Sequence, residues 1–377
     1  MNRRQSWNII LLFCILIFGF TAATWVTPSK EFSDTENRAL AQFPQPSLET
    51  VLNGEFESDY EKYLSDQFPG RDGWIGLKTD AERAMLRQES KDIYFAKDGY
   101  LIEKHTGSFT TDTAQGNIRL LAGFFEKYQE EYQGHLTAMV VPNAVDILRD
   151  KLPPFASPYD QEEYLALVEN ALPQEVWFDT ASILKEHKEE EIYYRTDHHW
   201  QTKAAFYVWQ EWAKEQGFEI PSEEDYRVET VTEEFEGTVQ SKLGISVQPD
   251  SIQIYVHEED PFYTVDTGTG EESYSVYDLE ALNTKSKYDV YFGGNHALVK
   301  IRTQADTGRR ILLIKDSYAH CFAPFLVTEF DQIDLVDIRY YNQNLSQLIE
   351  EGNYTDLMFL YNASGFAEDV NFSKLLL

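Results

Sequence analysis

The first feature in the pattern of apolar and polar positions is an uncharged run near the N-terminus. Residues 7–26 carry no charge and follow Arg3 and Arg4. About 20 apolar residues match the hydrocarbon thickness of a bilayer, and arginines before such a run keep the N-terminus inside. We therefore expect 1–29 to be a single-pass membrane anchor, with the main chain outside. A cleaved signal peptide is the alternative, because Thr21-Ala22-Ala23 supplies small residues of the cleavage type.

Residues 30–115 show short elements interrupted by breakers. The apolar spacing predicts helices over 56–68 and 74–86, and Asp98-Gly99 lies between β-prone flanks as the turn of a hairpin. We expect this region to be an adaptor that packs on the core.

From residue 116 to the C-terminus the pattern alternates between helical and strand periods, which predicts βαβ units and a parallel sheet flanked by helices. The predicted helices are 118–132, 161–171, 181–191, 202–216, 318–327 and 344–351. The predicted strands are 135–141, 176–179, 310–315, 332–338 and 356–361. Between them, residues 217–300 predict a β-rich insertion with strands at 228–235, 251–257, 274–277 and 287–292.

Composition narrows the class of protein. The net charge is −32, from 64 acidic and 32 basic residues, so the chain repels phosphate backbones and nucleic acid is excluded as a partner. The cysteines, Cys14 in the apolar run and Cys321 far along the chain, provide no disulfide framework. We expect no cofactor and no zinc site of the usual ligand spacing.

A serine follows a buried-type strand directly. Asp316-Ser317-Tyr318 comes after the strand 310–315 and opens a predicted helix, where parallel α/β sheets place their sites. The Ser317 N–H would lie near a helix N-terminus, where positive partial charge stabilises an oxyanion. An N-cap serine with no chemical role is the alternative.

The segment Thr196-Asp197-His198-His199-Trp200 places a carboxylate two residues from an imidazole. Such a carboxylate can hold the ring of His199 as a general base, which is its role in a catalytic triad. Two histidines beside an aspartate could also be metal ligands. We expect His198 to have a structural role. A third candidate is Asn362, whose amide at the end of the strand 356–361 could donate a hydrogen bond into the site; an ordinary turn asparagine is the alternative.

Together these motifs resemble a known family. Residues 197–200 match the signature of the bacterial DHHW family, and further matches are 36–38, 66–71, 193–195 and 316–318. The chain is similar, more distantly, to the periplasmic proteins of alginate O-acetylation, whose motif has Asp and His at positions matching Asp197 and His199.

The resemblance implies an SGNH-hydrolase-like, flavodoxin-like fold in which the Asp/His segment precedes the serine strand. It implies Ser317 as nucleophile, His199 as base and Asp197 as the orienting carboxylate. Asn362 falls where SGNH enzymes carry an oxyanion asparagine, although the surrounding Gly-x-Asn-Asp pattern is absent. No glycine follows the strand 332–338, where the sequence has Arg339 and Tyr340. We include these two residues and Tyr194 as candidates for oxyanion or substrate contacts.

The implied activity is a serine-dependent O-acetyltransferase or acetylesterase that acts on a cell-surface or exported polysaccharide through an acyl-serine. The protein would work at the outer side of a bacterial cell membrane, with a membrane-bound O-acyltransferase as the partner that supplies acyl groups. A non-catalytic glycan-binding or scaffold protein of such an acetylation system is the rival interpretation.

Overall fold

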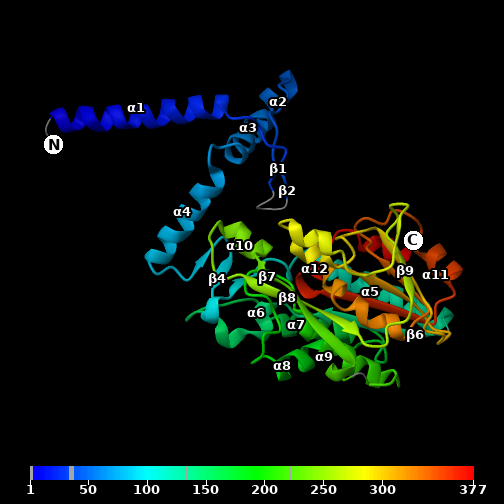
Figure 1. Ribbon diagram of the computed structural model, residues 1–377. Coiled ribbons are helices and arrows are strands. Elements are labelled where there is room, and N and C mark those ends of the chain that lie inside the picture. Colours follow the sequence, from blue (N-terminus) through cyan, green and yellow to red (C-terminus); the bar gives the residue numbers. More distant parts are fainter. Residues whose placement is uncertain (1–2, 34–37, 133, 221) are drawn as a thin grey trace. The chain divides into compact units, whose positions relative to one another are not determined.

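A seven-stranded sheet organises most of the chain (Figure 1). The computed structural model describes residues 3–33, 38–132, 134–220 and 222–377. These residues form two units, each described by itself: unit 1 comprises residues 1–87 with 240–246, and unit 2 comprises 88–239 with 247–377.

The central sheet of unit 2 is mixed rather than parallel. Its strand order is β10-β9-β11-β13-β12-β14-β6. The strands are β6 (His135–Val141), β9 (Tyr263–Asp266), β10 (Glu272–Ser273), β11 (Leu298–Thr303), β12 (Arg310–Lys315), β13 (Gln332–Val336) and β14 (Asp356–Asn362). Strands β6, β14, β12 and β13 run parallel, whereas β11, β9 and β10 join by antiparallel pairing. Our expectation of a parallel sheet therefore holds for only four strands. The short turn from β9 to β10 permits only antiparallel pairing.

The region 217–300, predicted as a β-rich insertion, divides between two sheets. β7 (Tyr226–Phe235) and β8 (Asp250–His257) form a separate antiparallel pair, while β9, β10 and β11 extend the central sheet. The strand predicted at 287–292 is wrong, because Lys287–Val290 forms the 3-10 helix η5. This region also contains η3 (Glu223–Asp225), α10 (Thr238–Leu243) and η4 (Leu279–Asn283).

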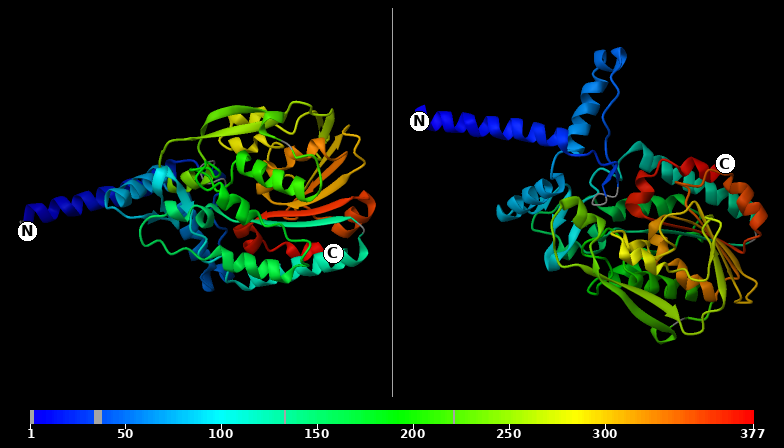
Figure 2. Two further views of the ribbon diagram at one scale, coloured as in Figure 1. Left: turned by 90° about the horizontal axis from the view of Figure 1, so that it is seen from below. Right: turned by 45° about the horizontal axis from the view of Figure 1, so that its top comes forward.

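Helices cover both faces of the sheet (Figure 2). Alternate residues of β12 face opposite ways: Ile311 and Leu313 pack in one core cluster, and Leu312 and Ile314 in the other. The second cluster includes residues from α5 (Asp112–Glu131), α7 (Gln161–Ala171), α11 (Leu345–Gly352), α12 (Ala363–Glu368) and η8 (Phe372–Leu376). The first includes residues from α6 (Ala144–Ile147), α8 (Thr180–Glu186), α9 (Thr202–Glu215), η6 (Ser317–His320) and η7 (Ala323–Thr328).

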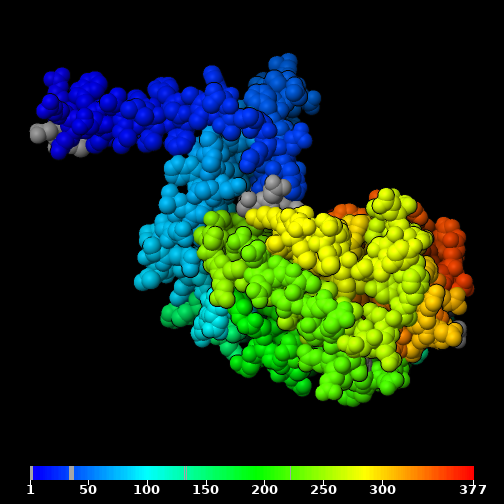
Figure 3. All heavy atoms as spheres, viewed as in Figure 1, coloured from blue at the N-terminus to red at the C-terminus, as the bar shows by residue number. Residues whose placement is uncertain are grey.

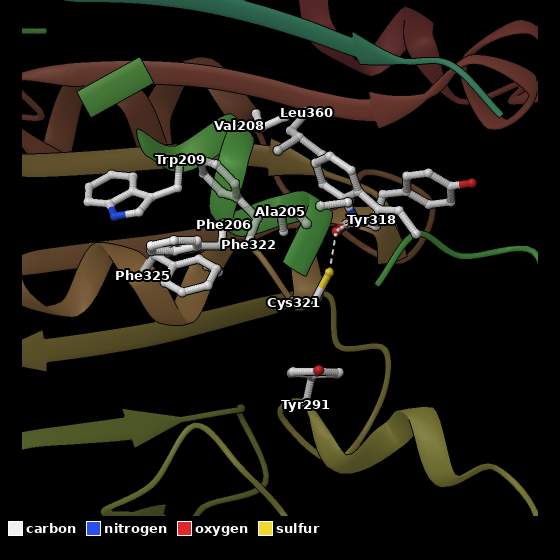
Figure 4. Packing of buried hydrophobic residues seen from close by; sticks show 14 of the residues in the cluster. Ala205, Phe206, Val208, Trp209, Tyr291, Tyr318, Cys321, Phe322, Phe325 and Leu360 are labelled. Carbon is white, nitrogen blue, oxygen red and sulfur yellow. Dashed lines mark hydrogen bonds between the residues drawn. The ribbon is translucent and has the colours of Figure 1, made fainter. Parts of the chain in front are cut away.

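The segment after β12 departs from the predicted helix over 318–327. It forms the two 3-10 segments η6 and η7. Their aromatic side chains still fill the core: Phe322 and Phe325 pack with Phe206 and Trp209 of α9 (Figure 4). Nearby, the Cys321 thiol points to the Tyr318 carbonyl (Figure 4). Both cysteines are free.

The start of unit 2 is a small antiparallel sheet, β3 (Glu89–Ser90), β4 (Ile93–Phe95) and β5 (Leu101–Glu103). Strands β4 and β5 confirm the predicted hairpin. Its connection is η1 (Lys97–Gly99), in which Asp98 and Gly99 adopt positive φ angles of 57° and 80°. The chain also forms η2 (Arg149–Lys151) after α6.

Unit 1 contains α1 (Arg3–Val26), β1 (Phe32–Ser33), β2 (Arg38–Ala39), α2 (Leu48–Leu52), α3 (Glu55–Asp66) and α4 (Arg71–Ala84), and it receives most of α10 (Thr238–Leu243). Among the described residues, α1 is the one helix long and apolar enough to cross a membrane, a test that a signal sequence also passes.

Two of the family-like motifs meet in unit 1. Arg38 donates two hydrogen bonds to Asp66, of 2.9 and 2.6 Å, and this pairing lowers the Asp66 pKa to about 2. Gln67 bonds the backbone of Lys30 and Ala41. Residues 36 and 37 of the first motif lie outside the described residues.

Candidate active site

Three side chains form a hydrogen-bonded line above the end of β12. The Nε2 atom of His199 lies 2.8 Å from the Ser317 hydroxyl oxygen, and its Nδ1 atom lies 2.6 Å from an Asp197 carboxylate oxygen. His199 and Asp197 are buried, whereas Ser317 is half-buried and so remains within reach of a ligand. The expected proximity of Ser317 and His199 is confirmed.

The carboxylate of Asp197 is held from two directions. One oxygen accepts the backbone N–H of His199, and the other accepts the backbone N–H and the hydroxyl of Thr238, at 2.7 and 3.0 Å. Burial alone would raise the pKa of Asp197, but the adjacent His198 and His199 and these donors outweigh burial and lower it well below its usual range. The carboxylate is therefore ionised and fixes the Nδ1 proton of His199, which leaves Nε2 free to accept from Ser317.

The Asp197–Trp200 segment is fastened to the serine segment by two reciprocal bonds. The Trp200 indole donates to the Tyr318 carbonyl (2.8 Å), and the Tyr318 hydroxyl donates to the His198 carbonyl (2.5 Å). An isolated antiparallel β-bridge between Tyr193 and Trp200 joins the two ends of the loop that contains Asp197 and His199. These bonds set the separation of His199 and Ser317 although the two residues are 118 positions apart in the sequence.

Asp316, rather than Ser317, caps the short helix η6. Its carboxylate accepts the Tyr318 N–H and two bonds from Asn362, one from the backbone and one from the side-chain amide, at 2.8 and 2.6 Å. Burial raises the pKa of Asp316 to about 6, although Arg339 and the two backbone donors oppose it. The alternative interpretation of Ser317 as an N-cap is wrong, because its neighbour performs that function.

Asn362 lies at the end of β14 as expected, but its amide serves the scaffold. Besides donating to Asp316, it accepts from Asn143 (3.1 Å), from the hydroxyl of Ser364 and from the N–H of Gly365 (both 2.8 Å). Its oxygen and one amide hydrogen are thus committed to holding the serine turn.

The other candidate residues, Arg339, Tyr340 and Tyr194, bond or pack against neighbouring groups. Arg339 binds Asp337 through Nε and Nη2, at 2.9 and 2.6 Å, and the Tyr340 ring is half-exposed beside it. Among the residues that the structure describes, no hydrogen bond joins either of them to the triad. Tyr194 is buried, with its ring against Phe235, so its side chain is part of the core.

Two further groups near Ser317 were not predicted from the sequence. Tyr288 stacks on His199, and its hydroxyl donates to the Ser317 carbonyl (3.3 Å). The second group is Lys315, the last residue of β12, whose buried amine lies 2.6 Å from His320 Nε2 and 3.7 Å from Asp337. Burial lowers the pKa of Lys315 to about 8 against the pull of Asp337. Of these groups only Lys315 could have been found from the sequence, because it is a charged residue at the end of an apolar strand.

A metal site at the motif competes with the triad for the same atoms. Ligand atoms of Asp197, His198 and His199 lie within 4.8 Å of one another. However, Nδ1 of His198 faces the Thr238 hydroxyl at 2.9 Å, and His199 uses one nitrogen for Asp197 and the other for Ser317. A metal would have to break one of these bonds, so the arrangement favours the triad.

Comparison with solved structures places the fold among known ones. A DHHW family protein from Eubacterium siraeum is similar, with TM-score 0.64 and 23% identity, over 76% of this chain and 96% of that one. PatB1 of Bacillus cereus matches with TM-score 0.62 and 21% identity, over 72% and 96%, and a second structure of PatB1 carries a sulfonyl adduct. The O-acetyltransferase domain of Pseudomonas putida AlgJ matches at 13% identity, over 75% and 98%, with a TM-score of only 0.46.

Sequence comparison identifies the family. No protein of curated function matches this chain. The family model described as DHHW protein matches residues 36–87 and 131–336, which is more than half of the sequence. The chain therefore belongs to the DHHW family.

Proposed function

We propose that this protein is a serine-dependent acyl-ester enzyme, an O-acetyltransferase or acetylesterase that acts on an exported or cell-surface polysaccharide. The observation that carries the proposal is the hydrogen-bonded line from Asp197 through His199 to Ser317, at 2.6 and 2.8 Å. A nucleophile, a base in contact with it and a carboxylate that orients the base are the parts that acyl transfer through an acyl-serine needs.

The chemistry proceeds in two halves. His199 takes the proton of the Ser317 hydroxyl as Oγ attacks the acyl carbonyl, and His199 then returns that proton to the departing group. The acyl-serine formed is opened by an acceptor hydroxyl, whose proton passes to His199 and then back to Ser317. A sugar hydroxyl as acceptor gives transfer, and water gives hydrolysis.

Stabilisation of the oxyanion falls to the backbone in this proposal. The N–H of Ser317 opens η6 and, among the described residues, has no hydrogen-bond acceptor of its own. Such an N–H beside the attacking oxygen is a usual oxyanion donor. The amide of Asn362 contributes indirectly, because it fixes Asp316 and hence the turn that carries Ser317.

The acetyl group, the polysaccharide and the partner rest on the resemblance of the Asp197/His199 motif to the alginate O-acetylation proteins. An anchored enzyme outside the membrane has no access to cytosolic acyl-coenzyme A. We therefore propose a membrane-bound O-acyltransferase as the source of acyl groups, with α1 as the anchor.

Covalent labelling tests the nucleophile. An arylsulfonyl fluoride should attach to Ser317 of the full-length protein, as located by peptide mass analysis, and release of acetate from an activated ester should stop in parallel. Ser317→Ala and His199→Ala should abolish both, whereas Ser346→Ala, which removes a hydroxyl that accepts from Lys127 and donates to the Leu377 carbonyl, should change neither. Labelling that survives in Ser317→Ala would contradict the assignment.

A scaffold without catalysis is the second candidate, favoured by one observation: the amide of Asn362 is committed to the structure. The two proposals differ in cells. If polysaccharide acetylation persists in a strain that carries Ser317→Ala but is lost on deletion of the gene, the scaffold is correct.

A further inference from the structure

Helix α4 presents its apolar side outward and its small, polar side inward. Trp74, Leu77 and the following Met85 are 48%, 59% and 66% exposed, and they recur at helical spacing on one side. The buried positions are Gly76, Thr79 and Glu82. This orientation is the reverse of the one that a water-facing helix adopts.

The close packing of unit 1 fixes this orientation. The Thr79 hydroxyl donates to the Leu243 carbonyl at 2.8 Å, and a Cβ on Gly76 would lie 2.2 Å from the carbonyl oxygen of Gly244. The inner side of α4 thus has room only for small residues. Rotation of α4 to bury Trp74 and Leu77 would force larger side chains against this backbone, so the apolar side stays outside.

The exposed side of α4 begins where α1 contacts Phe68 and Trp74. The Phe20 ring lies 5.1 Å from the Phe68 ring and 5.7 Å from the Trp74 ring, measured between centroids. Phe20 precedes the end of α1 at Val26 by six positions, about 9 Å along a helix. If α1 spans the bilayer over residues 7–26, Phe68 and Trp74 therefore lie level with the outermost acyl-chain segments, within the roughly 5–10 Å that the apolar face of an interfacial helix penetrates.

We propose that α4 lies on the outer surface of the membrane, with Trp74, Leu77 and Met85 at the boundary of headgroups and acyl chains. The atoms of α4 form part of the molecular surface in Figure 3. Lys78, exposed beside this stripe, suits the headgroup level. We assign lipid to this apolar side of α4 because Trp74 contacts Phe20 of the membrane-spanning helix, so the two apolar surfaces are continuous. The proposal rests on the anchoring role of α1 and is independent of the chemistry at Ser317.

Depth-dependent fluorescence quenching tests the proposal with the full chain in vesicles of phosphatidylcholine and phosphatidylglycerol. Three labelled proteins, all with Cys321→Ala, carry one environment-sensitive fluorophore each: on the natural Cys14 of α1, or at Leu77→Cys or Arg83→Cys, both with Cys14→Ser. Arg83 is exposed on the opposite side of α4 and is the matched control. Lipids with a nitroxide near the headgroup provide the quencher.

The labels at positions 14 and 77 should shift to shorter emission wavelengths, and position 77 should lose several-fold more fluorescence to the shallow quencher than position 83. A blue shift at 14 without quenching at 77, or equal quenching at 77 and 83, would overturn the membrane contact of α4 and leave the anchor intact. A blue shift at 77 without quenching would assign this side to a protein partner or a second copy and also overturn it. Absence of a blue shift at 14, which lies near the middle of the span, would overturn both this proposal and the anchor.

Discussion

The imidazole of His199 stacks on the phenol ring of Tyr288, with centroids 3.8 Å apart and planes inclined by 13°. The Tyr194 ring in turn meets Tyr288 edge-on, at 6.3 Å. The ring that faces Ser317 is thus held by a flat surface as well as by Asp197, and its freedom to turn about its bond to Asp197 is small.

We expect Tyr288→Leu to lower kcat for acetate release by about 10- to 100-fold, because a ring displaced by even 1 Å loses its alignment with the serine. Tyr288→Phe keeps the stack and loses only the long bond to the Ser317 carbonyl, so it should retain most of the activity. Steady-state kinetics with an activated acetyl ester would check this order. Equal losses in both variants would show that the hydroxyl, not the ring surface, matters.

Asp197→Asn should leave a small residual activity. The amide no longer fixes the Nδ1 proton of His199, and loss of this role in a triad costs about 10⁴-fold in kcat. It also faces the Thr238 N–H with fewer acceptor sites, so we expect a loss of stability of about 1–3 kcal/mol as well. Kinetics and urea unfolding on the same samples separate the two effects. Activity within tenfold of the wild type would contradict the orienting role.

His198→Ala should reduce stability more than turnover. Its Nδ1 atom bonds the Thr238 hydroxyl at 2.9 Å and thereby supports the loop that holds Asp197, while its ring lies beside rather than between the reacting groups. A loss of about 1 kcal/mol in the free energy of unfolding is expected. A kcat that falls as far as in His199→Ala would overturn this structural role and reopen the metal interpretation.

Asn362→Leu keeps the volume but removes the amide that holds Asp316. The variant leaves buried partners unsatisfied at Asp316, Asn143 and Ser364, so the free energy of unfolding should fall by about 2–4 kcal/mol. Asn170→Leu, at an exposed position of α7, should change it by less than about 0.5 kcal/mol. Urea denaturation of both variants gives the comparison, and equal effects would deny Asn362 this role.

The buried Lys315 predicts a dependence of stability on pH. Its folded pKa of about 8 lies below the ordinary lysine value of 10.5, so between these values the unfolded chain binds more protons and stability rises with pH. Wild-type protein should gain about 1–2 kcal/mol from this group between pH 8 and 9.5, and Lys315→Met should lack that gain. Urea midpoints of the pair across this range measure the difference, and parallel curves would exclude the shift.

The sequence predicted most of what local pattern controls. The strands 135–141 and 310–315 and the helix 161–171 have the predicted boundaries. The failures lie where tertiary contacts decide. Residues 318–327 have a helical pattern, yet the chain turns there as two 3-10 segments, with Pro324 opening the second.

The candidate site likewise contains residues that local sequence predicted and residues that only tertiary contacts bring to it. Ser317, His199 and Asp197 lie in short motifs, and the structure brings their side chains together as the sequence predicted. Thr238 and Tyr288 reach the site from other segments through tertiary contacts, and a tyrosine or threonine in a β-rich region has no local sequence signal of such a contact. Tyr194 is the opposite case: it lies in a family-like motif, yet its ring packs in the hydrophobic core.

The position of β14 in the sheet determines when the site can exist. Among the seven strands of the central sheet this one is synthesised last, yet it lies between β6 and β12 and pairs with both. Until it arrives, β6 and β12 have no common neighbour, and Asp316 lacks the donors that set the turn at Ser317. A nascent chain that lacks β14 therefore has no fixed turn at Ser317, and the hydrogen-bonded line of Asp197, His199 and Ser317 is completed only after every strand of the central sheet has been synthesised.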